Sequence, residues 1–149
     1  MWTLRKANNK GINIMIWECT ISHLVGDGEK EKVVKEKYVF KNCESFGEVE
    51  GKILTLFDHY NNLDVVAIKR SKICEIINAK RYQDDKIFEA TIRDVFVDDD
   101  GNEKNITYTM LLCADGFDNA LPMILDYLRQ GYDMELVRLR KTPIVDILI

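Results

Sequence analysis

Basic side chains recur in two short segments of the chain, and their chemistry is the first clue to function. The first segment contributes Lys69, Arg70 and Lys72, and the second contributes Arg138, Arg140 and Lys141. Ammonium and guanidinium groups are the cations with which proteins bind phosphate oxygens. If the two segments line one groove, they form a site for nucleic acid or another anion. The alternative is structural, since Glu18 and Glu89 are placed to form surface salt bridges with Lys69 and Arg140 across neighbouring strands.

Aromatic side chains are the second group that could contact nucleic acid, because they stack on bases whatever the base sequence. Trp17 and Phe88 occupy equivalent positions in two similar segments, and so do Tyr38 and Tyr108. Alternation along the expected strands places these four side chains on the apolar side, which predicts core packing rather than stacking. Three further aromatic residues lie outside the expected elements and remain available to stack: Trp2, Tyr82 and Tyr132.

Residues suited to metal binding or acid–base catalysis do not form a recognisable motif. The run from Asp98 to Glu103 is acidic, but a calcium loop starting at Asp98 would place Thr109 where the acidic twelfth ligand belongs. We therefore expect a solvated turn there. His23 and His59 lie outside any zinc-binding pattern, and the sequence has no nucleophilic serine elbow or glycine-rich nucleotide loop. The sequence predicts no catalytic residue, metal site or cofactor, and a metal-dependent nuclease remains as the enzymatic alternative.

Composition describes one ordinary soluble domain of the cytoplasm. The chain has 149 residues, 46% hydrophobic and 31% charged, and this balance excludes a disordered tail or a collagen-like rod. No stretch approaches the roughly 18 apolar residues of a membrane span, and the beginning of the chain is too polar for a signal peptide. The cysteines, at positions 19, 43, 74 and 113, are scattered singly and predict buried thiols in a reducing compartment. The net charge of -4 means that any site for a polyanion must be local.

An internal repeat with an offset of about 71 residues is the strongest pattern in the sequence. The hexapeptide IWECTI returns as IFEATI, and each copy continues into a polar turn that contains glycine. Two later blocks follow in the same order: Tyr38 to Cys43 matches Tyr108 to Cys113, and Val66 to Ile77 matches Val137 to Leu148. The order of these blocks predicts two tandem copies of one unit, over residues 14–77 and 87–148.

Each copy contains the periodicities of two strands, a helix and a third strand. Alternating apolar residues predict hairpins from 14–24 with 34–43 and from 87–97 with 105–113. Three- and four-residue spacing predicts helices over 45–60 and 116–130, with Ser45 and Asp115 as caps, a kink at Pro122 and a stop at Gly131. Third strands are expected at 63–70 and 134–141, and each runs through a break into a short apolar continuation.

These elements predict an α+β fold made of two tandem, pseudo-symmetric β-β-α-β repeats in a single domain spanning residues 1–149. We expect an antiparallel-rich sheet with both helices packed on one face, and one core shared by the two halves, because an isolated unit of this size would be marginally stable. An uncovered sheet edge or face on so small a domain also favours a homodimer.

Four short segments resemble a family of uncharacterised proteins of about this length from gut bacteria and their phages. The segments are Trp17-Glu18-Cys19, Cys43-Glu44-Ser45, Ile68-Lys69-Arg70 and Ile144-Val145-Asp146-Ile147, and the resemblance extends from about Ile14 to Leu148. It implies a phage-linked accessory protein in the cytoplasm of a bacterial host, and it carries no catalytic residue to this chain. The basic segment around Arg138 departs from what the resemblance leads one to expect.

The sequence as a whole favours a non-enzymatic accessory protein of phage type that binds single-stranded nucleic acid through its duplicated basic strands. The alternative is a phage counter-defence or interaction protein that binds a protein partner or a small anionic nucleotide with the same cations. No membrane association is expected.

Overall fold

The computed structural model describes residues 15–78, 82, 84–130 and 134–149, which form two compact units. We call residues 15–71 together with 143–149 the first unit, and residues 72–142 the second unit. Within the described residues, each unit contains one four-stranded sheet and one α-helix. Trp2, Tyr132 and Gly131, on which three of the sequence predictions depend, lie outside the described residues.

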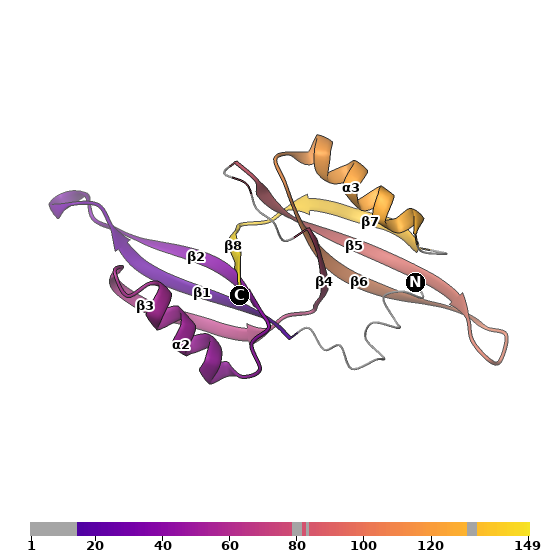
Figure 1. Cartoon of the computed structure of the whole chain (residues 1–149), viewed down its shortest axis with the longest axis horizontal. Helices are drawn as coiled ribbons and strands as arrows, with labels where there is room; N and C mark the ends of the chain where they lie inside the picture. Colours follow the sequence, from indigo (N-terminus) through magenta and orange to yellow (C-terminus); the bar gives the residue numbers. More distant parts are fainter. Residues whose placement is uncertain (1–14, 79–81, 83, 131–133) are drawn as a thin grey trace. The chain divides into compact units, whose positions relative to one another are not determined.

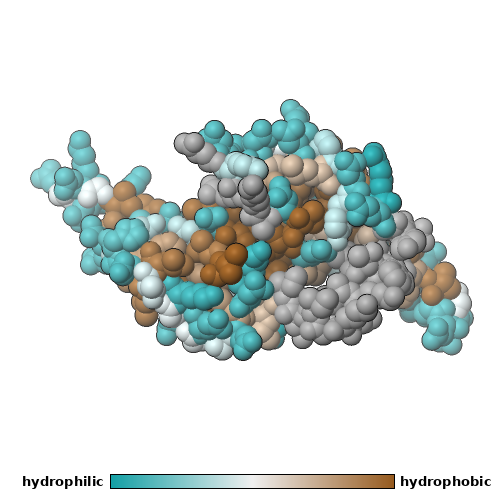
Figure 2. Space-filling view, in the orientation of Figure 1, coloured by the Kyte–Doolittle hydropathy of each residue, from teal (hydrophilic) through white to brown (hydrophobic). Residues whose placement is uncertain are grey.

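The first unit begins with a long antiparallel hairpin (Figure 1). Strand β1 (Ile16–Val25) pairs along its whole length with β2 (Lys32–Lys41), and a short 3₁₀ turn, η1 (Gly28–Lys30), lies between them. Gly26 is required at this turn, because its φ of +109° is unfavourable for other residues and an added Cβ would lie 2.4 Å from the Lys30 carbonyl oxygen. The turn residues are exposed, and hydrophilic side chains gather at this tip in Figure 2.

Helix α2 (Phe46–Leu56) and strand β3 (Asn61–Arg70) follow the hairpin. Ser45 caps the helix as predicted, since its Oγ accepts a hydrogen bond from the Glu48 amide at 3.2 Å. The Glu48 carboxylate in turn accepts from the Glu44 amide at 2.8 Å. Strand β3 pairs antiparallel with β1 on the side away from β2, and the sheet order is β3-β1-β2-β8.

The second unit has the same arrangement of elements. Strands β5 (Lys86–Val97) and β6 (Glu103–Ala114) form the hairpin, α3 (Phe117–Arg129) follows, and β7 (Met134–Lys141) pairs antiparallel with β5. The sheet order is β4-β6-β5-β7, which matches the first sheet element by element. In each unit the strand after the helix pairs with the first strand of the hairpin and forms one edge of the sheet. This strand is β3 beside β1 in the first unit, and β7 beside β5 in the second.

The fourth strand of each sheet comes from the other half of the sequence. Strand β4 (Ile73–Asn78) follows β3 after only two residues, yet it pairs parallel with β6 in the second unit. Strand β8 (Ile144–Leu148) follows β7 after two residues, yet it pairs parallel with β2 in the first unit. These are the short apolar continuations expected from the sequence, and the two halves of the chain exchange them.

Each unit has its own hydrophobic core between its helix and one face of its sheet. In the first unit β1 contributes Trp17, Cys19 and Ile21, which pack with Val49 and Ile53 of α2. In the second unit the equivalent strand contributes Phe88, Ala90 and Ile92, which pack with Ala120 and Ile124 of α3. Trp17 is 8% and Phe88 is 3% exposed, so the prediction that these aromatic residues are buried is confirmed.

The structure confirms the α+β class and the β-β-α-β order, and corrects how the units are put together. The expected sheet with two helices on one face is wrong: there are two four-stranded sheets, and each is covered by its own helix. The shared core is likewise replaced by two separate clusters of buried residues. The physical reason is the exchange of β4 and β8, which gives each sheet four strands and enough apolar surface for a core of its own.

A second correction concerns the register of the repeat. The sequence match equates Tyr38 with Tyr108, but Tyr38 lies opposite Cys19 whereas Tyr108 lies opposite Ile92, the counterpart of Ile21. The two tyrosines therefore occupy positions two residues apart along the strand. A shift of two residues keeps every side chain on the same face, so the alternating pattern cannot distinguish the two registers.

No helix in the described part of the chain is long and apolar enough to cross a membrane.

Candidate anion-binding sites

The six predicted cations are all exposed, and the structure divides them between the two units. Lys69 and Arg70 end β3 in the first unit, Lys72 lies at the start of the second unit, and Arg138, Arg140 and Lys141 lie on β7. Within a strand the cations are also divided between the two faces of the sheet, because neighbouring residues point to opposite faces.

Within each unit the helix-covered face and the opposite face receive different cations. Arg70 lies opposite Trp17 in the register, and its guanidinium carbon is 6.0 Å from the centre of the indole ring, within reach of a cation–π interaction. Lys141 lies opposite Phe88, which also belongs to the helix-covered face. Lys69 and Arg140 lie opposite the two equivalent glutamates, on the face that carries no helix.

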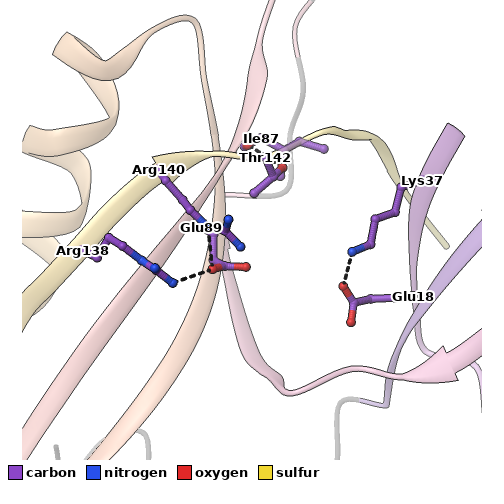
Figure 3. Close-up of polar contacts among 7 residues, drawn as sticks. All are labelled: Glu18, Lys37, Ile87, Glu89, Arg138, Arg140 and Thr142. Atoms are coloured by element: carbon purple, nitrogen blue, oxygen red, sulfur yellow. Dashed lines mark hydrogen bonds and ion pairs between the residues drawn. The ribbon is translucent and has the colours of Figure 1, made fainter.

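The second unit brings two arginines together on one carboxylate (Figure 3). Arg140 Nε donates a hydrogen bond to Glu89 Oε1 at 3.1 Å, and a terminal nitrogen of Arg138 lies 3.7 Å from the same oxygen. The Arg138 and Arg140 side chains are 59% and 54% exposed, whereas that of Glu89 is 18% exposed. We call Arg138 and Arg140 the arginine pair. Two guanidiniums and one carboxylate give the group a net charge of +1.

One further pair of charges on the same strands is balanced one to one. Arg93 on β5 pairs with Glu135 on β7, and these residues lie opposite each other in the register. Since this pair has no net charge, it adds nothing to the positive charge of the arginine pair. Most of the N–H donors of the two guanidiniums are not used by Glu89, because each guanidinium carries five.

The first unit carries a row of lysines on the corresponding face. Alternation along β2 places Lys35, Lys37 and Lys41 on the face opposite α2, and the register adds Lys69 on β3. We call these four residues the lysine face. The sequence reasoning missed the three lysines of β2, although the alternating pattern of KVVKEKYVFK contained the signal.

The predicted salt bridges of the two equivalent glutamates are half confirmed. Glu89 pairs with Arg140 as expected, and with Arg138 in addition. Glu18 pairs instead with Lys37 on β2, whose Nζ lies 3.1 Å from its carboxylate, although Lys69 lies directly opposite in the register. Within the described residues, no carboxylate forms an ion pair with Lys69.

The acidic run at the β5–β6 turn is structural, as predicted. Asp98 Oδ1 accepts hydrogen bonds from the backbone amides of Asp100 at 3.0 Å and Asn102 at 2.8 Å. This carboxylate therefore organises the turn and has less capacity to bind a ligand. Across the described residues, no three His, Cys, Asp or Glu side chains are grouped as a metal site would need.

The cysteine thiols have little nucleophilic character. Burial raises the pKa of Cys19 to about 11, and burial together with the neighbouring Glu75 carboxylate raises the pKa of Cys74 to about 12. Because the thiolate is the reactive form, both groups are poor nucleophiles at neutral pH. Cys19, Cys43 and Cys113 are buried, and Cys74 is partly buried.

A polar network at one end of the first unit was not expected from the sequence. His23 Nε2 lies 2.7 Å from Glu36 Oε1, and the imidazole stacks on Tyr60 with ring centres 4.0 Å apart. Burial, followed by hydrogen bonding to Tyr60, raises the pKa of Tyr38 in the same cluster. His23 carries 9% of its side-chain surface exposed, so this network belongs to the core more than to the surface.

Comparison with known proteins places the chain in a family without assigning it a function. No curated protein and no solved structure matches the chain significantly. A family model does match, and its match extends over residues 15–149, which include both units and both exchanged strands. The chain therefore belongs to the family described as a domain of unknown function, DUF4494.

Proposed function

We propose that this protein is a non-enzymatic binding protein that contacts the phosphate groups of single-stranded nucleic acid. The observation that carries the proposal is the arginine pair, in which two exposed guanidiniums share one partly buried carboxylate and keep most of their donors for a ligand. The lysine face of the first unit supports it, since Glu18 is paired with only one of its four cations.

The surroundings of these cations favour a single strand over a duplex. Duplex readers commonly insert a basic helix into the major groove. Here α3 carries Asp118 in its first turn and Asp126 further along, while α2 carries Glu48 and Glu50, so neither helix offers a basic surface. The cations lie on strands instead, where a flexible phosphate backbone can follow a sheet face.

We expect binding to depend weakly on base sequence. The aromatic residues Trp17, Phe88 and Tyr38 are buried, so they cannot serve as stacking platforms. Tyr82 is 62% exposed and has the most exposed side chain among the described Phe, Tyr and Trp residues. Recognition then rests on phosphate contacts, whose contribution falls steeply with salt.

The test is fluorescence anisotropy with a labelled mixed-sequence oligonucleotide of about 30 nucleotides, titrated at several salt concentrations. We expect a slope of about 0.7 logarithmic units per neutralised phosphate and decade of salt, and Lys69→Ala with Arg140→Ala should reduce it by about one to two phosphates. The matched control is Lys52→Ala with Arg129→Ala, which removes the same charge from the two helices. The control should leave the slope nearly unchanged.

Three outcomes would contradict this proposal. Absence of binding in about 20 mM salt would remove nucleic acid as the ligand, because electrostatic affinity is greatest there. If the double variant changed only thermal stability, the cations would serve as salt-bridge partners. Binding to a protein partner or to a compact nucleotide that the double variant abolishes, without oligonucleotide binding, would favour the interaction-protein alternative.

The biological setting and the assembly belong to the same proposal. We propose an accessory role in bacteria and their phages, in the cytoplasm, with the protein acting as a homodimer. Strands β3 and β7 lie at the edges of their sheets, and a sheet edge offers backbone groups to a second copy. Light scattering after size-exclusion chromatography measures the mass directly, and a monomer at all concentrations would contradict the dimer.

A further inference from the structure

The arginine pair differs from the other cations because its counter-ion is built into the protein. Glu89 lies on β5, next to β7, and its carboxylate is within 3.7 Å of both guanidiniums. Its low exposure, 18% of the side-chain surface, means that the carboxylate is anchored beneath two side chains that are more than half exposed. An incoming anion must therefore compete with this carboxylate or bind beside it.

The charge of the ligand decides that competition. Each internal phosphodiester of a nucleic acid carries one negative charge, which equals the charge of the Glu89 carboxylate. Glu89 is tethered to the site and competes with an internal phosphodiester, which therefore binds the two arginines less tightly than a phosphate of higher charge does. A terminal phosphate monoester carries about -1.5 to -2 charge at pH 7 and presents three acceptor oxygens. It is attracted by the net charge of +1 and can accept from both guanidiniums at once.

We infer that the arginine pair prefers a terminal phosphate monoester to the internal phosphodiesters that it also contacts, and that the competing Glu89 carboxylate creates this preference. The inference rests on the proposed binding of nucleic acid and adds a preference for one end of the strand. Two sources supply the same chemistry: the 5′-phosphate of an oligonucleotide and the phosphate of a free nucleoside monophosphate.

The experiment compares oligonucleotides of one sequence, about 30 nucleotides long, that carry either a 5′-phosphate or a 5′-hydroxyl and are labelled at the other end. Adenosine monophosphate is the competitor. We expect the full-length protein to bind the phosphorylated strand about tenfold more tightly, which is about the contribution of one hydrogen bond to a charged group. The preference should shrink at about pH 5.5, where the monoester loses most of its second charge.

Three variants locate the effect. Arg138→Ala with Arg140→Ala should abolish the preference for the phosphorylated end. Glu89→Gln should increase binding of the hydroxyl strand and reduce the preference, because internal phosphodiesters then meet two arginines without a competing carboxylate. Arg129→Ala is the matched control, since Arg129 is 75% exposed and pairs with Asp126 on α3, and it should leave the preference unchanged. Circular dichroism of each variant verifies folding.

The outcomes separate this inference from the proposed function. Equal binding of the two strands by the wild-type protein would overturn the inference while nucleic-acid binding stands. If adenosine monophosphate binds and is lost in the arginine double variant, while the hydroxyl strand does not bind at all, the monophosphate site is supported and nucleic acid is rejected. A preference that survives in the arginine double variant would also overturn the inference, because the terminal phosphate would then be held elsewhere.

Discussion

Single residue differences decide how the two equivalent glutamates are used. In the first unit the residue diagonal to Glu18 on β2 is Lys37, and the two side chains form an ion pair. In the second unit the position diagonal to Glu89 on β6 is Thr109, which offers no charge. Glu89 instead forms ion pairs with Arg138 and Arg140 on β7. One pattern of strands thus produces an ion pair with β2 in one unit and two ion pairs with β7 in the other.

Burial of Trp17 gives the first residue-scale prediction. The indole is 8% exposed, packs in the core of the first unit and donates a hydrogen bond from Nε1 to the Cys43 carbonyl oxygen at 2.8 Å. Trp17→Ala should lower the free energy of unfolding by about 3–5 kcal/mol, as large-to-small core changes do. Urea denaturation followed by circular dichroism measures the change.

Phe46→Ala is the matched control for Trp17→Ala. Phe46 is also aromatic, lies at the start of α2 and is 50% exposed, so its replacement should cost far less than that of Trp17. Equal unfolding midpoints for the two variants would contradict the core position of Trp17.

The buried thiols give a prediction about alkaline pH. The pKa of Cys19 is raised from 9.0 to about 11 and that of Cys74 from 9.0 to about 12, chiefly by burial. As pH rises past 9, the unfolded chain loses these protons before the folded chain does, so the folded state is progressively disfavoured. Their contribution to stability is complete below pH 9 and is lost as pH rises through about 11 to 12.

Urea midpoints measured between pH 8 and pH 11 test this dependence. The wild-type midpoint should fall over this range, and Cys19→Ala with Cys74→Val should make the fall shallower. Tyr38 and Tyr127, whose pKa values are also raised by burial, contribute with the same sign at the upper end of the range. A double variant with an unchanged pH dependence would show that the thiols are not responsible.

At the scale of elements, the two helices begin differently although they occupy equivalent positions. Ser45 caps α2 through its side chain, whereas Gly116 is the N-cap of α3 and supplies no side-chain hydrogen bond. The prediction that Asp115 caps α3 is wrong. Asp115 lies one residue before the N-cap, and its carboxylate accepts a hydrogen bond from the Asn119 side chain. The helix continues through Pro122 to Arg129, and the predicted kink at Pro122 stays a prediction.

The caps provide an element-scale prediction with opposite signs. Ser45→Ala should destabilise the protein by about 1 kcal/mol, because the Glu48 amide loses its acceptor. Gly116→Ser should stabilise it by a few tenths of a kcal/mol, since the backbone there is extended and an added Cβ meets no atom within 4 Å. Chemical denaturation of both variants measures the pair, and a destabilising Gly116→Ser would contradict the capping geometry.

At the scale of the whole molecule, the reciprocal exchange of β4 and β8 makes the stability of each unit depend on both halves of the sequence. Ile77 on β4 packs against the core of the second unit, and Leu148 on β8 packs against that of the first. A substitution in one of the exchanged strands should therefore lower the stability of the unit that is built mainly from the other half of the sequence.

Hydrogen exchange tests this exchange of strands peptide by peptide. Ile77→Ala should speed amide exchange in β5 and β6 and leave β1 to β3 protected, while Leu148→Ala should do the reverse. Both residues are partly buried, so we expect costs of about 1–2 kcal/mol, below the range for fully buried side chains. Ile149→Ala is the control, since Ile149 is 71% exposed. Faster exchange in the sequence-adjacent unit instead would contradict the strand order.

The sequence predicts the local elements well because their causes are local. Alternation around Trp17 and Phe88 identifies the hairpins, and the spacing from Phe46 and from Phe117 identifies the helices. The pairing of Glu89 with Arg140 follows from the same reasoning, since the repeat places both residues at corresponding positions. These features depend on neighbours a few residues away or on one strand pairing that the repeat itself indicates.

What the sequence determined by itself is the identity and order of the elements, the residues of each buried face and the positions of the cations. Only the tertiary structure decided which strands share a sheet, the register of Tyr38 against Tyr108, and which cations meet: Arg138 with Arg140 on Glu89, but Lys37 rather than Lys69 on Glu18. The physical reason is that alternation specifies the face of a side chain and not its neighbour, because any strand with a matching apolar face can pair and a shift of two residues leaves that face unchanged.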